Sequence, residues 1–61
     1  MTYKVGLLEL PRKDDPEFSD YEEAEGKAIE LSKNNEGTGI AIRMGRWDVF
    51  AIVFDEEVFK K

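Results

Sequence analysis

The sequence predicts an α+β fold, with a single small βαββ domain over residues 1–61. Two patterns predict it: three segments alternate in the manner of strands, and one acid-rich segment repeats its apolar residues at helical spacing. We expect a three-stranded antiparallel sheet, in spatial order 1-3-2, with the helix packed on one face. A chain of this length buries only about 60% of the surface that its unfolded form exposes, so its core alone provides little stability.

The first predicted strand covers residues 3–10, where Tyr3, Val5 and Leu7 share one face. Pro11 ends this strand because proline has no N–H to donate to a neighbouring strand. Residues 11–18 are then expected to form a polar loop.

The predicted helix covers residues 19–34 and begins with a capping box, in which Ser19 is the N-cap and the Glu22 carboxylate returns to the backbone of residue 19. Small residues repeat along its buried face, at Ala24, Ala28 and Ser32. These small side chains let the helix approach the sheet closely. Glu25 lies near the apolar stripe and is the one carboxylate that we expect to be partly shielded from water, where its ordinary role is to reach solvent or to pair with a lysine at the sheet edge.

The second and third strands are predicted at residues 38–44 and 47–54, joined by a type II′ turn at Gly45-Arg46. That turn sets four pairs opposite each other: Met44 and Trp47, Arg43 and Asp48, Ile42 and Val49, and Ala41 and Phe50. Residues 58–61 follow as a short amphipathic tail.

The third strand is apolar on both faces, which places it at the centre of the sheet. The face assigned to the helix carries Ile40, Ile42, Met44, Trp47, Val49, Ala51 and Val53. The second face carries Gly39, Ala41, Phe50, Ile52 and Phe54. Nothing else in the predicted fold covers the second face, so it needs either a second copy of the chain or the C-terminal tail. We predict a homodimer, with these five residues as the self-association face.

Charge is distributed unevenly along the chain, whose net charge is −5. Residues 14–36 hold nine acids and two lysines, whereas the rest holds five acids and seven bases. The predicted partner-binding face is the acidic side of the helix, formed by Asp20, Glu22, Glu23 and Glu30. A basic protein is the expected partner, and direct nucleic-acid binding is disfavoured by the negative field. The alternative is an acidic inhibitor that mimics nucleic acid, of the kind phages encode, and blocks a nucleic-acid-binding site.

The chain contains few residues that suit catalysis or metal binding. The chain has no cysteine and no histidine, which excludes the usual zinc ligands and the common nucleophile–base pairs. An acidic loop starting at Asp15 fails as a calcium loop, because Asp20 stands where glycine is required. Gly37-Thr38-Gly39 precedes a strand, whereas phosphate-binding glycines open a helix. We therefore predict a protein that is not an enzyme, with no catalytic residue, metal or cofactor.

The location expected from the sequence is the cytoplasm. No basic segment precedes an apolar run, so we expect no signal peptide, and no run approaches the ~20 apolar residues of a membrane span. The compact βαββ plan resembles that of many short prokaryotic or phage proteins. This likeness is one of shape alone and implies no site residues.

Overall fold

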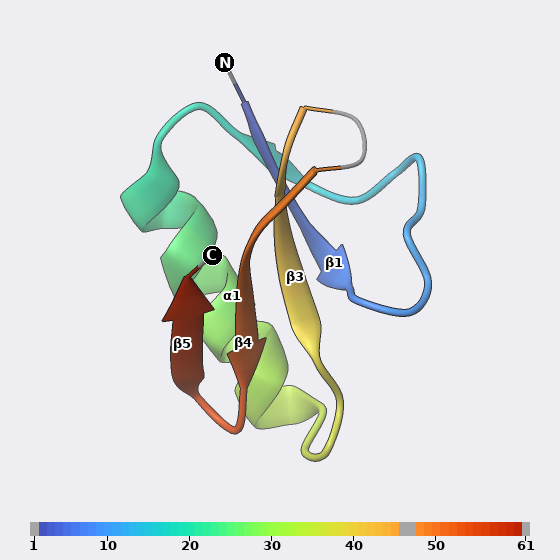
Figure 1. Cartoon of the computed structure of the whole chain (residues 1–61), viewed down its shortest axis with the longest axis vertical. Coiled ribbons are helices and arrows are strands. Elements are labelled where there is room, and N and C mark those ends of the chain that lie inside the picture. The colour runs from blue at the N-terminus through green and yellow to red at the C-terminus, as the bar shows by residue number, and fades with distance from the viewer. Residues whose placement is uncertain (1, 46–47, 61) are drawn as a thin grey trace.

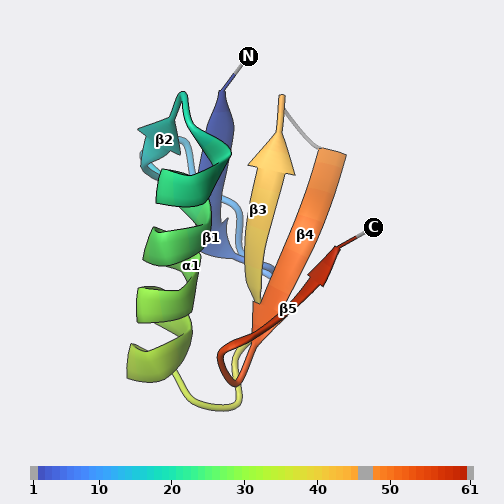
Figure 2. The same cartoon turned by 90° about the vertical axis from the view of Figure 1, so that its left-hand side faces the viewer.

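The computed structural model describes residues 2–45 and 48–60, and there one helix packs against one face of a five-stranded antiparallel sheet (Figure 2). The elements are β1 (Tyr3–Leu7), β2 (Glu17–Phe18), α1 (Tyr21–Asn34), β3 (Ile40–Met44), β4 (Asp48–Phe54) and β5 (Glu57–Lys60). The strands lie side by side in the order β2-β1-β3-β4-β5, and Figure 1 shows β1, β3, β4 and β5 in that sequence. The predicted α+β class with one helix is correct, but the three-stranded sheet in order 1-3-2 is wrong.

The central strand is β3, and β1 pairs with β3 instead of with β4. The reason is that β3 is the strand buried on both sides. Ile40 and Ile42 are fully buried toward the helix, while Ala41 and Arg43, on the other face, are buried as well. The apolar residues on both faces of β4 led to the wrong central strand, and the burial of an arginine in β3 could not be anticipated from its residue type.

The helix begins at Tyr21, with Asp20 as its N-cap, and among the described residues no side chain makes a capping hydrogen bond at this end. The predicted capping box at Ser19 is therefore wrong. The small residues behave as expected: Ala24, Ala28 and Ser32 are the buried residues of α1. They lie against a core that also contains Val5, Ile40, Ile42, Ala51 and Val53.

The β3–β4 hairpin has a different register from the predicted one. Met44 pairs with Asp48, and the register shifts between Ile42 and Arg43, which is the mark of a β-bulge. Ile42 pairs with Ala51 and Arg43 with Val49, so Phe50 is the extra residue. The predicted II′ turn and the predicted inward position of Trp47 involve residues 46 and 47, which lie outside the described residues.

The predicted tail is a strand. β5 pairs with β4 through a two-residue turn in which Asp55 and Glu56 both have positive φ, 49° and 66°. Two left-handed residues between strands define a type I′ turn, whose twist suits a hairpin. The backbone N–H of Glu56 donates to the Ser32 Oγ at 2.9 Å, which ties this turn to the helix. Residues 57–60 thus extend the sheet sideways and do not cover its second face.

Candidate interaction surfaces

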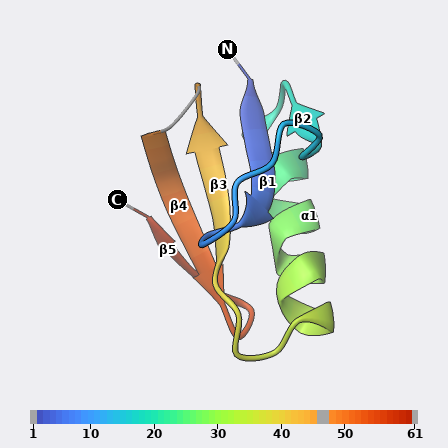
Figure 3. The ribbon, with the colours of Figure 1, turned by 90° about the vertical axis from the view of Figure 1, so that its right-hand side faces the viewer.

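Segment 8–16 covers part of the sheet face opposite the helix, which we call the second face. The segment leaves the end of β1 and runs back in front of it before β2 (Figure 3). Gly6 provides the space for it, since a Cβ at this position would lie 2.5 Å from the Asp15 Cγ. Leu8 packs over Gly39 in the same way, with its Cδ2 3.3 Å from the position of a Cβ there. The β1–β3 half of the second face is therefore closed within one chain.

Arg43 lies beneath this cover and is only 6% exposed. Its Nη2 donates to the carbonyl oxygens of Leu8, at 2.9 Å, and Leu7, at 3.4 Å. Its buried Nη1 has no hydrogen-bond partner among the described residues. A buried guanidinium is unfavourable unless it is bonded, so the hydrogen bond to Leu8 helps to hold the start of segment 8–16 on the sheet.

The five residues of the predicted self-association face do not come together as predicted. Ala41 is fully buried under segment 8–16, and Gly39 is half-buried beneath Leu8. Only Ile52 and Phe54 remain on the accessible part of the second face, because the bulge turns Phe50 to the helix side.

Phe50 packs into an aromatic cluster on the helix side of the sheet. Its ring lies 6.2 Å from that of Tyr3 and 5.3 Å from that of Tyr21, both edge-to-face. Tyr3 and Tyr21 are themselves 5.5 Å apart. Lys60 of β5 places its Nζ 4.9 Å from the centre of the Tyr21 ring, a cation–π contact that holds β5 against the helix.

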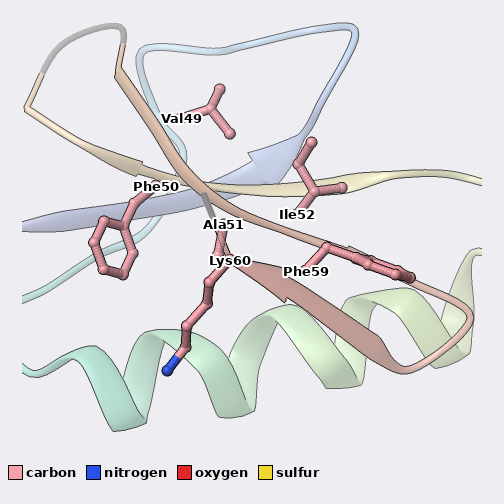
Figure 4. A pocket seen from close by; sticks show the side chains of 6 residues that line it. All are labelled: Val49, Phe50, Ala51, Ile52, Phe59 and Lys60. Atoms are coloured by element: carbon pink, nitrogen blue, oxygen red, sulfur yellow. The ribbon is translucent and has the colours of Figure 1, made fainter.

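The open half of the second face is formed by Val49, Ile52, Phe54 and Phe59, which we call the β4–β5 patch. Figure 4 shows Val49 and Ile52 pointing away from the helix, while Phe50 and Lys60 point toward it. Phe59 pairs directly with Ile52, so both side chains lie on the same face. Phe54 is 42% exposed and Phe59 is 54% exposed.

A shallow hollow of about 410 Å³ adjoins this patch, lined by Val49, Phe50, Ala51, Ile52, Phe59 and Lys60. Phe59 was missed as a surface residue because its segment was interpreted as a tail. The available signal was composition, because Val58 and Phe59 are a β-branched and an aromatic residue, which are common in strands.

The predicted acidic face lies on the solvent side of the helix. Asp20, Glu22, Glu23 and Glu30 are all exposed. Two lysines reduce its charge: Lys27 pairs with Glu30 at 3.3 Å, and Lys33 pairs with Glu56 at 3.9 Å. DNA carries about one charge per 1.7 Å of axis, so a 14-residue helix of ~21 Å would have to match ~12 charges. The four acids fall well short of that density.

Glu25, the predicted shielded carboxylate, is half-buried next to Tyr21. Burial, followed by the nearby Glu25 carboxylate, raises the pKa of Tyr21 to about 12. No hydrogen bond to the Tyr21 hydroxyl meets the usual geometry among the described residues, so Glu25 acts on it electrostatically. A tyrosine with a raised pKa stays neutral at physiological pH, and this pair provides no activated nucleophile.

A second hollow, of about 320 Å³, lies between segment 8–16 and the end of α1. Its polar lining includes Arg12, Lys27 and Asp15, so it presents no single sign of charge. Within the described ranges, no cluster of acidic side chains is arranged to hold a metal ion. The described helix is not long and apolar enough to span a membrane.

Comparisons with protein-family models, curated proteins and solved structures find no match to this chain.

Proposed function

We propose that the protein is a non-enzymatic interaction module that self-associates as a weak homodimer through the β4–β5 patch. The observation that carries this proposal is the exposure of two phenylalanines on one sheet face, Phe54 at 42% and Phe59 at 54%. Contiguous exposed apolar side chains on a small soluble protein usually mark a binding site. The half-buried Ile52 lies beside Phe59 and two residues from Phe54 on the same face, and the half-buried Val49 extends this surface along β4.

The size of the patch predicts a weak and reversible dimer. The exposed parts of the two rings together equal about one whole phenylalanine, or ~200 Å² per copy. Burying this surface on both copies stabilises the dimer by about 10 kcal/mol. The loss of translational and rotational freedom on association opposes it by about 4–15 kcal/mol. The lowest association cost leaves a surplus of about 6 kcal/mol, which corresponds to a dissociation constant of about 50 µM, and a surplus of about 4 kcal/mol corresponds to about 1 mM, so we expect a value in this range.

The acidic face of the helix would stay free in such a dimer, because α1 covers the opposite side of the sheet (Figure 2). We propose that this face presents Asp20, Glu22 and Glu23 to a basic protein partner. The exposure of these three carboxylates supports the proposal. Their modest charge density favours a basic patch on a protein over a site built for duplex nucleic acid.

Sedimentation equilibrium on patch variants tests the self-association. Phe59→Ser removes the more exposed ring, and we expect it to weaken the dimer at least tenfold, with a smaller loss for Phe54→Ser. Leu10→Ser is the matched control, because Leu10 is 50% exposed but lies outside the patch. Equal weakening by all three variants would contradict a specific role for the β4–β5 patch.

The acidic face is tested with the triple variant Asp20→Lys, Glu22→Lys and Glu23→Lys. We expect self-association to be unchanged and the capture of basic proteins from the native host to be lost. Capture by the wild type should weaken as salt is raised, since exposed charges are screened. Equal capture by the wild type and the triple variant would remove the basic partner from the proposal.

A further inference from the structure

β5 is the open edge of the sheet. The described strands end at β5 on one side and at β2 on the other. β2 has only two residues, and segment 8–16 continues along that edge, where the Val5 N–H donates to the Pro16 carbonyl at 3.1 Å. β5 has four residues in extended conformation with no further strand beside it in the described part of the chain. It is therefore the edge at which another strand can pair.

The turn geometry determines which backbone groups of β5 point outward. A type I′ turn closes on a hydrogen-bonded pair, here Phe54 and Glu57. Hydrogen-bonded and non-hydrogen-bonded pairs then alternate along an antiparallel ladder. Glu57 and Phe59 direct their N–H and C=O groups toward β4, and Val58 and Lys60 direct theirs to the open edge. Two residues in each copy are thus ready to form a second ladder.

The patch alone falls short of a stable interface. Specific interfaces bury about 800 Å² on each partner, several times the exposed area of the two phenylalanine rings. Pairing at the β5 edge supplies the additional contacts that a stable interface needs, because it adds backbone hydrogen bonds directly beside Phe59. It also places Phe59 of one copy beside Phe59 of the other, so that each ring buries part of the other's exposed surface.

We propose that two copies join by antiparallel pairing of their β5 strands about a twofold axis perpendicular to the sheet, with Phe59 opposite Phe59 of the second copy. This inference rests on the self-association proposed above and specifies its geometry. Val58 of each copy exchanges backbone hydrogen bonds with Lys60 of the other. The two Phe59 side chains meet across the axis in a non-hydrogen-bonded pair, where side chains approach most closely. Each β5 edge is used once, so the assembly closes at two copies.

The competing register places Val58 opposite Val58 and Phe59 opposite Glu57, which sets an aromatic ring against a carboxylate. It also needs Glu56 to join the ladder. Glu56 has a φ of 66°, outside the extended region, and its N–H already donates to Ser32. The register centred on Phe59 avoids both conflicts.

Single cysteines test this geometry cleanly, because the chain contains no cysteine of its own. In the proposed register the Cα atoms of residue 59 lie about 4.5 Å apart, within the range of a disulfide. Phe59→Cys should therefore form a covalent dimer under mild oxidation. Glu57→Cys, on the same strand and face, is the control that should stay monomeric, because its Cα atoms would be about 14 Å apart.

Amide exchange of the wild type gives a second readout that needs no substitution. We expect the Val58 and Lys60 amides to become at least tenfold more protected as concentration rises, with little change at Phe59. Efficient linking of Val58→Cys instead of Phe59→Cys, or fast exchange at both amides in a protein that sedimentation shows to be dimeric, would overturn this arrangement while leaving self-association intact. A wild type that stays monomeric would overturn both.

Discussion

Replacement of Gly6 by alanine tests how segment 8–16 covers the second face. A Cβ at this position would lie 2.5 Å from the Asp15 Cγ, so the carboxyl group must move away. Its Oδ2 accepts a hydrogen bond from the Arg12 backbone N–H at 3.1 Å, which the movement would break. The movement of Asp15 also disturbs the hydrogen bond from Arg43 to the Leu8 carbonyl, because Leu8 and Asp15 both belong to segment 8–16.

The magnitude follows from these contacts. A neutral hydrogen bond contributes about 0.5–1.5 kcal/mol and one to a charged group about 1.5–3 kcal/mol. Alanine is itself more favourable than glycine in a strand by about 0.5–1 kcal/mol, which offsets part of this loss of stability. We expect Gly6→Ala to lower the free energy of unfolding by about 1–3 kcal/mol, and the melting temperature to fall by about 5–20 °C.

A double-mutant cycle separates this clash from other effects of alanine. In a background carrying Asp15→Gly the carboxylate is absent, so Gly6→Ala should be stabilising by about 0.5–1 kcal/mol. Urea unfolding, followed by far-UV circular dichroism, gives the free energy of unfolding of the wild type, the two single variants and the double variant. The reasoning is refuted if Gly6→Ala has the same effect with and without the Asp15 side chain.

Three further predictions concern the helix. Gly26→Ala should raise the free energy of unfolding by about 1 kcal/mol in thermal melts, since a Cβ there meets open space, and no gain would argue against a well-formed exposed helix. Ser32→Ala should lower it by about 1 kcal/mol and speed amide exchange at Glu56, which loses its hydrogen-bond acceptor; unchanged exchange would contradict the link between helix and turn. Because the pKa of Tyr21 is raised to about 12, the unfolded chain ionises first, so stability should be level below pH ~10 and fall as pH rises toward 12. Tyr21→Phe should flatten this fall in urea titrations, and an unchanged slope would assign the fall to other groups.

The helix was largely predictable from the sequence because its signals are local. Helical spacing placed Ala24, Ala28 and Ser32 on the buried side, and the structure buries all three. The starting residue was wrong because Ser19 and Asp20 are both common N-cap residues, and the sequence does not say which one adopts the role.

The sheet was predicted poorly because its determinants are not local. The bulge after Ile42 moves Phe50 to the other face, and one extra residue in a strand reverses the orientation of the residues before it. β5 follows a turn of Asp55 and Glu56, which lacks the glycine that normally identifies a type I′ turn. The burial of Arg43 depends on segment 8–16, whose path over Gly6 has no sequence signature.

The candidate surface on the helix was predicted well, and the one on the sheet was predicted only in part. The exposed acids of α1 lie where helical periodicity placed them. The apolar surface retained Ile52 and Phe54, whereas Phe59 entered it only through the pairing of β5 with β4. Alternation within a strand identifies a face, but long-range pairing decides which part of that face stays open.

The average mass of the wild-type protein in solution, measured by sedimentation equilibrium as a function of concentration, tests the exposed β4–β5 patch most directly. The mass should rise from 7.0 kDa in dilute solution toward twice that value as concentration approaches about 2 mM. A mass that stays at 7.0 kDa over the whole range would mean that the exposed phenylalanines bind no second copy.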